Sequence, residues 1–377
     1  MHKPESVFKC IREQGIRFST GVPDSLLKGF CAYLTENSGN RDHVIAANEG
    51  NAIALAVGHY LSTGKPALVY MQNSGIGNAI NPLLSLADPE VYSVPMLLLI
   101  GWRGEPGIKD EPQHMKQGRV MTELIDAMEI PWFELSSDTD SPGKLIDKAC
   151  RIMRKKSMPV ALLARKGAFE RYSSEDDMPP NFSMNREGAI KCVIDLLAKH
   201  DVVVSTTGKA SREVYEHRAD RGDGHANDFL TVGGMGHTAS IAMGVALGQP
   251  GRQVICLDGD GSVFMHMGAL AIIGQSPIPN FIHVVINNGA HDSVGGQPTV
   301  GFDVSLPKVA EACGYRQAVS VSSLEEIRAE MTRLREVEGP VMLEILTNKG
   351  ARDDLGRPKT TPLANRDAFM ARLGVES

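Results

Sequence analysis

One pattern of residues occurs twice in this chain, once in each half. Residues 56–75 and 242–261 both contain a helix rich in small residues, a turn with Gly and Pro, and an apolar strand followed by a turn that closes on glycine. The two segments align without a gap, and residues 18–21 match 205–208 at nearly the same offset. Chance similarity between α/β units is the alternative, but the register kept through the whole strand favours the interpretation that the halves are copies of one module.

Both halves alternate short apolar strands with helical segments, which predicts parallel sheets covered by helices. The predicted fold is therefore α/β, with two similar doubly wound parallel-sheet modules and no middle domain. The predicted strands are 18–20, 44–46, 67–71, 96–100, 132–135, 160–164, 202–205, 229–232, 254–257, 282–286, 317–321 and 341–345. The modules are predicted at 1–169 and 186–377, joined by a polar linker at 170–185. Ligand sites are expected at the carboxyl ends of the strands.

Charge and composition exclude several classes of protein. The net charge of −6 argues against a nucleic-acid surface. No apolar run approaches the length needed to span a bilayer, and the first residues contain no apolar signal core. The six cysteines are scattered and include no Cys-x-x-Cys pair. We therefore expect a cytoplasmic protein with reduced thiols and no zinc site.

The segment 256–262, Cys-Leu-Asp-Gly-Asp-Gly-Ser, is followed later by the pair Asn287-Asn288. It predicts a strand that ends in a glycine-rich turn, a helix, and a second strand that ends in asparagines. Backbone N–H groups in such a turn suit a phosphate. Asp260 and Asn288 offer oxygen ligands to a hard cation, and Mg²⁺ binds best where phosphate oxygens complete its shell. These residues predict a metal-bridged diphosphate site.

This arrangement resembles the signature of thiamine diphosphate-dependent enzymes, in which Gly-Asp-Gly and a later Asn-Asn hold the cofactor through Mg²⁺. The resemblance implies thiamine diphosphate and Mg²⁺ as cofactors, with a pyrimidine-binding first half and a diphosphate-binding second half. In that family the two modules come from different subunits, so a homodimer or larger oligomer with the active site between subunits is implied. The implied cofactor-binding residues are Glu49, Thr207, Gly208, Gly234, Met235, Gly259, Asp260, Gly261, Ser262 and Asn288, and the metal ligands are Asp260, Asn288 and Ala290.

Two of these residues have specific roles in the family. Glu49 begins a predicted helix, where the dipole favours a charged carboxylate, so a capping role is the alternative. In thiamine diphosphate enzymes a glutamate at this place contacts the aminopyrimidine ring and promotes the tautomer that removes the thiazolium proton. Met235 fits the apolar residue that such enzymes wedge between the two rings of the cofactor, with a core methionine as the alternative.

Three polar segments at predicted strand ends are candidates for substrate binding: 21–25, the loop 104–114 with the flanking cations Arg103, Lys116 and Arg119, and 206–212. The cations Arg103, Lys109 and Lys209 are candidates to neutralise an anionic substrate, although a solvated surface loop is the alternative for the second segment. Asp24 and His114 are candidates for a relay that protonates the intermediate of a thiamine diphosphate reaction. The predicted catalytic residues are Glu49, Asp24 and His114, and the predicted substrate-binding residues are Ser25, Arg103, Lys109, Asp110 and Gln113.

A narrower resemblance covers nearly the whole chain. Gly-Val-Pro-Asp-Ser (21–25), Lys-Asp-Glu-Pro-Gln-His (109–114), Ser-Thr-Thr-Gly-Lys (205–209) and Asn-Asn-Gly-Ala-His-Asp-Ser-Val-Gly-Gly-Gln (287–297) together resemble the phosphonopyruvate decarboxylase family. The resemblance implies decarboxylation of 3-phosphonopyruvate to phosphonoacetaldehyde and CO₂, in phosphonate and antibiotic biosynthesis. The sulfopyruvate decarboxylases, which form sulfoacetaldehyde, have similar halves and are the alternative.

Rival functions rest on fewer residues. Gly234-x-Gly236-x-x-Ala239, with Asp258 at the end of the next strand, matches a loose dinucleotide fingerprint and is the basis for an NAD-dependent oxidoreductase. That hypothesis leaves the Gly-Asp-Gly and Asn-Asn motifs unexplained. A non-catalytic relative that keeps the cofactor site is a further alternative, and the presence of Glu49 argues against it. A carboligation side reaction stays open.

Overall fold

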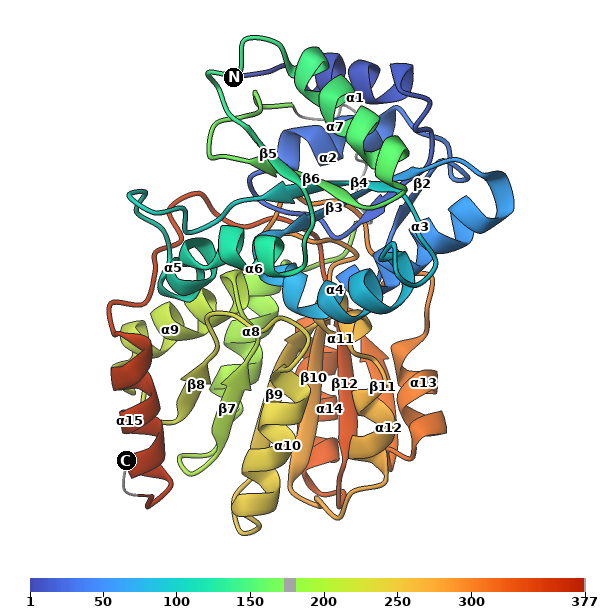
Figure 1. Cartoon of the computed structure of the whole chain (residues 1–377). Coiled ribbons are helices and arrows are strands. Elements are labelled where there is room, and N and C mark those ends of the chain that lie inside the picture. Colours follow the sequence, from blue (N-terminus) through green and yellow to red (C-terminus); the bar gives the residue numbers. More distant parts are fainter. Residues whose placement is uncertain (173–180, 376–377) are drawn as a thin grey trace. The chain divides into compact units, whose positions relative to one another are not determined.

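The computed structural model describes residues 1–172 and 181–375. The chain divides into two compact units, residues 1–177 and 178–377 (Figure 1). The predicted limits of the two modules and of the linker stay predictions, and residues 173–180 of that linker lie outside the described residues. At the far end of the predicted linker, Asn348 exchanges two hydrogen bonds with the backbone of Phe182, at 3.0 and 2.8 Å. This end of the linker therefore packs on the second unit.

The first unit is a six-stranded parallel sheet with strand order β2-β1-β3-β4-β6-β5. Its strands are β1 (Ser19–Gly21), β2 (His43–Ile45), β3 (Ala67–Gln72), β4 (Met96–Gly101), β5 (Trp132–Leu135) and β6 (Val160–Ala164). Its helices are α1 (Pro4–Glu13), α2 (Lys28–Glu36), α3 (Glu49–Thr63), the 3-10 turn η1 (Asn73–Gly75), α4 (Ile76–Pro82), the π-helical turn η2 (Leu83–Ala87), α5 (Pro112–Arg119), α6 (Met121–Ala127) and α7 (Pro142–Lys156).

The second unit is also a six-stranded parallel sheet, with strand order β11-β12-β10-β9-β7-β8. Its strands are β7 (Val202–Ser205), β8 (Asp228–Leu230), β9 (Val254–Gly259), β10 (Phe281–Asn287), β11 (Gln317–Val321) and β12 (Val341–Leu346). Its helices are α8 (Arg186–Asp195), α9 (Lys209–Arg221), α10 (Thr238–Gly248), α11 (Asp260–Met265), α12 (Ala269–Gly274), α13 (Leu306–Cys313), α14 (Leu324–Arg335) and α15 (Pro362–Arg372).

The two sheets have the same topology. Counting β7 as the first strand of the second sheet turns its order into that of the first sheet, read from the opposite edge. All twelve predicted strands are present. Four of them have the predicted bounds, and the others shift or extend by one or two residues. The predicted pair of similar doubly wound modules is therefore confirmed.

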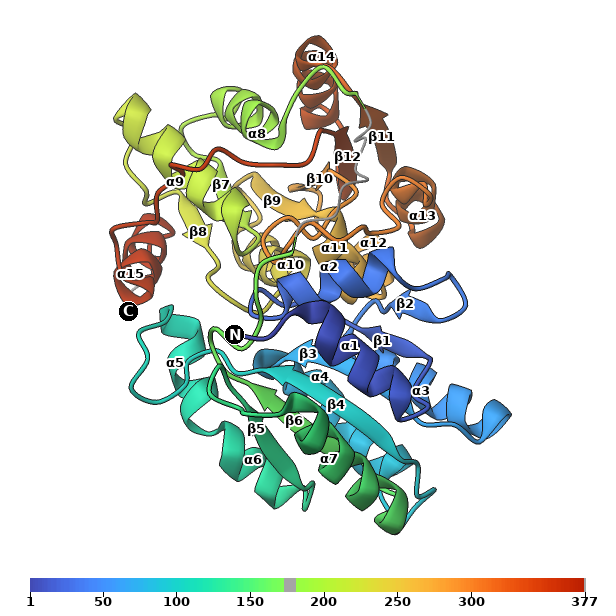
Figure 2. The ribbon, with the colours of Figure 1, turned by 90° about the horizontal axis from the view of Figure 1, so that it is seen from above.

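Helices cover both faces of each sheet (Figure 2). In the first unit, α1, α2 and α7 pack on one apolar cluster and α3, α4 and α6 on the other. In the second unit, α8, α9 and α14 cover one face, and α10, α12, α13 and α15 cover the other. Every residue of β4 is buried, since a parallel strand between two helical layers has no solvent face. This explains why the strands read as continuous apolar runs rather than as alternating patterns.

The strand orders determine where ligands can bind. In each sheet the chain first winds toward one edge and then toward the other, so the direction of winding changes between β1 and β3 and between β7 and β9. Open parallel sheets bind ligands beyond the carboxyl ends of strands at such a switch point. Within the described part of the chain, no helix combines the length and apolar character needed to cross a membrane.

Candidate active site

Asp260 lies at the switch point of the second sheet, where β9 passes directly into α11. The predicted glycine-rich turn is shorter than expected: Gly259 is both the last residue of the strand and the N-cap of the helix. Strand pairing with β10 extends to Gly259, which lies opposite Ile286, and this leaves no room for a separate loop. The carboxylate of Asp260 is consequently the first side chain beyond the sheet.

The Asp260 carboxylate is buried, with 2% of the residue exposed. Burial raises the pKa of this carboxylate to about 6. Hydrogen bonds from the Thr299 hydroxyl and from the backbone N–H groups of Gly261 and Asn288 lower the pKa, but by less than burial raises it. Among residues 1–172 and 181–375, no basic side chain forms an ion pair with it. A buried carboxylate that lacks a cationic partner costs free energy, and a bound divalent cation would offset that cost.

Asn288 follows β10 and lies beside Asp260, as the motif predicts. Its side-chain oxygen accepts a hydrogen bond from the backbone of Ala290 at 3.1 Å, and its amide nitrogen donates to Asp292 at 3.1 Å. Ala290 pairs with Pro298 in an isolated antiparallel bridge, which folds the loop back and brings Thr299 to Asp260. The three residues predicted as metal ligands thus lie just beyond the ends of β9 and β10, and their role as ligands stays a prediction.

Ser262 connects the other residues predicted to bind the diphosphate. Its hydroxyl accepts from the Thr206 hydroxyl at 3.3 Å and from the backbone N–H of Gly236 at 3.1 Å. Gly208 has φ +95°, and a Cβ there would lie 2.5 Å from the Ser293 hydroxyl, so only glycine fits. The ends of β7, β8 and β9 therefore meet around one serine, with Thr207 and Gly208 at the start of α9.

Met235 occupies a tight turn before α10. Both flanking residues, Gly234 and Gly236, have positive φ, at +66° and +88°. A Cβ on Gly236 would lie 2.3 Å from Nδ1 of His266. The two glycines therefore allow the tight turn that contains Met235, whose side chain is half-buried.

The geometry argues against the dinucleotide alternative. Asp258 would have to reach a ribose, but only 1% of it is exposed. Its Oδ1 accepts from the backbone N–H of Gly259 at 2.9 Å, and its Oδ2 lies 3.8 Å from Nε2 of His283. The side chain is thus directed into the core and away from any ligand beyond the sheet.

The same core contains a polar cluster that the cysteine spacing does not reveal. Cys256, Asp258 and His283 have potential metal-ligating atoms within 4.8 Å of one another. The other imidazole nitrogen of His283 lies 3.2 Å from the Tyr315 hydroxyl. All three residues are buried among apolar side chains, so we describe them as a polar cluster of the core and not as an open site.

In the first unit, Glu49 begins α3 and is buried. Its Oε2 accepts a hydrogen bond from the Asn78 amide at 2.8 Å. A Cβ on Gly75 would lie 2.2 Å from Oε1, so the carboxylate packs directly on the glycine that closes the turn after β3. The cap of α3 is Asn48, whose side chain accepts from Asn51. Glu49 is consequently not needed to cap the helix, which removes the simplest alternative for it.

Asp24, Ser25, Arg103 and Asp110 lie together beyond β1 and β4. The Arg103 guanidinium donates from Nε to Asp110 at 2.7 Å and from one terminal nitrogen to the Ser25 hydroxyl at 2.6 Å, and it also forms an ion pair with Asp110. Partial burial opposes ionisation of Asp110, but hydrogen bonds from Arg103, Glu111 and Gly104 outweigh it and hold the pKa of Asp110 well below its usual range. The structure therefore brings together four of the predicted residues.

Asp24 is fully buried, and its Oδ1 has no hydrogen-bond partner in the described part of the chain. Burial raises the pKa of Asp24 to about 6, although the backbone N–H of Leu26 and the nearby Arg103 lower it in part. Burial together with Arg103 lowers the pKa of His114 to about 4. His114 is therefore uncharged at neutral pH. Of the two groups, Asp24 has the pKa nearer to neutral pH.

Three further candidate residues, Gln113, Lys109 and Lys209, differ in their surroundings. Gln113 is partly buried, and its side-chain oxygen has no partner among the described residues. Lys109 is exposed and forms no ion pair with any described residue. Lys209, at the start of α9 in the second unit, lies 4.0 Å from Asp292. Of the three candidate cations, Arg103 is the one whose orientation is fixed.

Several polar residues at these sites were not predicted. Asn73 exchanges two hydrogen bonds with the backbone of Arg103, at 2.8 and 3.1 Å, and thereby joins the ends of β3 and β4. Asn78 holds Glu49, and Thr299 holds Asp260. The position of Asn73 directly after a strand was the available signal. Asn78 and Thr299 lie within a helix and a loop, where no pattern distinguishes them.

Comparison with known proteins identifies both halves. Residues 1–130 match the family model described as the N-terminal TPP binding domain of thiamine pyrophosphate enzymes, and residues 206–345 match the C-terminal TPP binding domain. Thiamine pyrophosphate is another name for thiamine diphosphate.

Relatives match over nearly the full length. A phosphonopyruvate decarboxylase of Streptomyces viridochromogenes is 37% identical over 95% of this chain and 91% of its own. One of Streptomyces hygroscopicus is 34% identical over 92% of this chain and 88% of its own. A sulfopyruvate decarboxylase of Methanosarcina acetivorans is 26% identical over 92% of this chain and 91% of its own. With both cofactor-binding domains and no domain between them, the chain belongs to the thiamine diphosphate-dependent decarboxylases.

Proposed function

We propose that this protein decarboxylates 3-phosphonopyruvate, giving phosphonoacetaldehyde and CO₂ with uptake of one proton. The observation that carries the proposal is the match to two phosphonopyruvate decarboxylases at 34–37% identity, against 26% for the sulfopyruvate decarboxylase of similar coverage. The fixed guanidinium of Arg103 supports an anionic substrate. A role in phosphonate biosynthesis, including that of antibiotics, follows from the proposed product.

The proposed cofactor site uses residues of the second unit. Asp260, Asn288 and Ala290 would hold Mg²⁺, and Thr207, Gly208, Gly259, Gly261 and Ser262 would surround the diphosphate. The burial of Asp260 without a cationic side chain supports this assignment. Gly234 allows the turn that presents Met235. When bound, thiamine diphosphate supplies a nucleophilic carbon and an electron sink.

The first unit is proposed to supply the acid–base groups. Glu49 would hold a proton shared with the aminopyrimidine ring, and its fixed carboxylate supports that role. Asp24 is the better candidate than His114 to return the proton after CO₂ leaves, because a general acid works best when its pKa lies near the working pH. A neutral His114 would instead offer a hydrogen bond.

Arg103 is proposed as the main contact for the substrate anion. The guanidinium carries five N–H groups, and three of them are used by Asp110 and Ser25. The remaining N–H groups suit the oxygens of a phosphonate or a carboxylate. Asp110, Ser25 and Gln113 would orient the charge, and the exposed Lys109 would add a second cation.

We also propose that the protein acts in the cytoplasm as a homodimer or larger oligomer. Six unpaired thiols support a reducing compartment. The proposed oligomer follows from the division of cofactor-binding residues between two modules, as in the family.

The test is decarboxylation by purified protein with thiamine diphosphate and Mg²⁺, with phosphonopyruvate, sulfopyruvate and pyruvate offered in parallel. Formation of phosphonoacetaldehyde with at least about tenfold higher kcat/KM than the sulfonate supports the proposal, since a factor of ten corresponds to about 1.4 kcal/mol of discrimination. A preference for sulfopyruvate would keep the chemistry and overturn the substrate. Bound cofactor without release of CO₂ would favour a non-catalytic role.

A further inference from the structure

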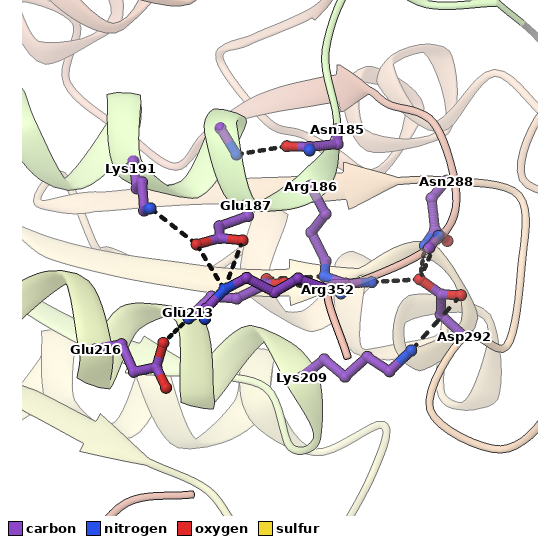
Figure 3. A network of polar contacts seen from close by, with 12 residues as sticks. Asn185, Arg186, Glu187, Lys191, Lys209, Glu213, Glu216, Asn288, Asp292 and Arg352 are labelled. Carbon is purple, nitrogen blue, oxygen red and sulfur yellow. Dashed lines mark hydrogen bonds and ion pairs between the residues drawn. The ribbon is translucent and has the colours of Figure 1, made fainter. Parts of the chain in front are cut away.

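Asp292 receives four polar groups from different parts of the second unit (Figure 3). Its carboxylate accepts from the amide nitrogen of Asn288 at 3.1 Å and from the backbone N–H of Gly350 at 3.0 Å. It forms an ion pair with Arg186, and its other oxygen lies 4.0 Å from the ammonium of Lys209. Asp292 therefore joins the loop after β10 to the starts of α8 and α9.

Arg186 is held in turn by a second carboxylate. Its Nε and one terminal nitrogen donate to the two oxygens of Glu213, both at 2.8 Å. The residues Arg186 and Glu213 are 6% and 1% exposed. A bidentate pair of this kind fixes the plane of the guanidinium, and its remaining nitrogen is directed at Asp292. The position of Asp292 is thus set by the core and not by its own loop.

The hydrogen bond between Asn288 and Asp292 determines which end of the Asn288 amide points away from Asp292. An ionised carboxylate only accepts hydrogen bonds, so it selects the NH₂ group and excludes the amide oxygen. The oxygen then faces the backbone N–H of Ala290, 3.1 Å away, and keeps a second lone pair. That oxygen is the atom required of a neutral metal ligand.

We propose that Asp292 is a positioning residue, which together with Arg186 and Glu213 holds the carboxamide oxygen of Asn288 toward the metal and diphosphate. The inference rests on the proposed cofactor site. Partners of the ligands often set metal affinity in this way, and their loss typically costs ten- to hundredfold.

The experiment is a titration of purified protein with Mg²⁺ in the presence of thiamine diphosphate, read by calorimetry and by the shift in Tm. In D292N the side chain at 292 loses its charge toward Arg186 and can present either an oxygen or an NH₂ group to Asn288. It therefore no longer selects one orientation of the Asn288 amide. Affinity for Mg²⁺ should fall about tenfold or more. The value of kcat at saturating Mg²⁺ should fall less than the affinity.

The matched control is D228N. Asp228 is also a buried carboxylate of the second unit, bound by Arg218 at 3.1 Å through two nitrogens, but it begins β8 at the opposite end of the strand from the site. This variant should lose stability and keep the affinity for Mg²⁺. Equal losses of affinity in D228N and D292N would overturn the inference, since they would indicate a general effect on folding.

A reversed pair tests the direction of the hydrogen bond. In the double variant N288D/D292N the residue at 292 becomes the donor and the residue at 288 the acceptor. Mg²⁺ affinity of the double variant should exceed that of N288D, which has the same carboxylate at 288 but two carboxylates facing each other. If D292N does not fold, R186K is titrated instead, because lysine keeps the charge and loses the bidentate geometry.

The outcomes separate this inference from the proposed function. Wild-type affinity for Mg²⁺ in D292N, with loss of affinity in D260N, overturns the role of Asp292 and leaves the cofactor site standing. No Mg²⁺-dependent binding by the unaltered protein overturns the site itself and the inference with it. Binding without turnover of phosphonopyruvate overturns only the substrate, because the titration does not depend on activity.

Discussion

The carboxylate of Glu49 packs against the backbone of Gly75, so closely that a Cβ on the glycine would lie 2.2 Å from Oε1. The other oxygen accepts from Asn78 at 2.8 Å. Two segments that follow β3 therefore hold an acid that begins α3. A residue proposed to share a proton with a ring nitrogen needs such fixed placement, because misplacement of a catalytic group by about 1 Å can cost a hundredfold in rate.

Replacement of Glu49 by glutamine keeps the shape and removes the carboxylate. We expect kcat to fall by at least about a hundredfold, which is the usual contribution of general acid–base catalysis. The amide can still pair with Asn78, so Tm should change little. Turnover is measured under saturating thiamine diphosphate and Mg²⁺. Activity close to that of the unaltered enzyme would remove Glu49 from the mechanism.

Substitution of Gly75 by alanine should displace the Glu49 carboxylate without altering the backbone. Gly75 has φ −75°, which alanine adopts readily, and the three nearest atoms that its Cβ would meet all belong to the side chain of Glu49. We expect a loss of kcat with retained folding. Gly77→Ala is the control, since a Cβ there meets nothing within 4 Å. If the two alanine variants have equal kcat, the packing of Glu49 on Gly75 is not important for catalysis.

The raised pKa of Asp24, about 6, makes the stability of the first unit depend on pH. Between about pH 4 and 6 the folded state keeps a proton that the unfolded chain releases, so stability falls as pH rises through this window. Asp24→Asn removes this dependence. Relative to wild type, the variant should gain on the order of 1–3 kcal/mol between pH 4 and 7, as measured by urea unfolding. Parallel curves for the two proteins would contradict the assignment.

Replacement of Arg103 by lysine keeps the charge but cannot reproduce the bidentate contact with Asp110. We expect KM for phosphonopyruvate to rise about tenfold, because the cation is no longer oriented toward the substrate. Arg151→Lys is the control: Arg151 forms an exposed pair with Asp147 at 3.0 Å on α7, and its replacement should leave KM unchanged. An unchanged KM in R103K would contradict this role of Arg103 and would favour Lys109 or Lys209 as the residue that binds the substrate anion.

The fold was largely predictable because parallel strands between two helical layers leave continuous apolar runs, as in β4. The strand ends were least certain, since they depend on pairing with neighbours. β9 extends to Gly259 only because β10 continues beside it. The motif residues, such as Asp260 and Asn288, could be identified because they directly follow predicted strands, and this is a local property of the sequence.

Partners from distant segments could not be predicted in the same way. Thr299 reaches Asp260 because Ala290 and Pro298 pair across a loop, and Arg186 reaches Asp292 across 106 positions of sequence. Such contacts depend on tertiary packing, for which a single sequence contains no periodic signal. The burial that shifts the pKa values of Asp24 and His114 has the same origin.

Because the two sheets have the same strand order, corresponding strand ends of the two units can be compared directly. At the same position, after the second strand of each sheet, the first unit has the acid Glu49 and the second unit has Met235 between two glycines. The strand order is thus shared, whereas the short segments beyond the strands differ. The buried strands fix where these segments lie, and the segments themselves determine which chemical groups each unit presents.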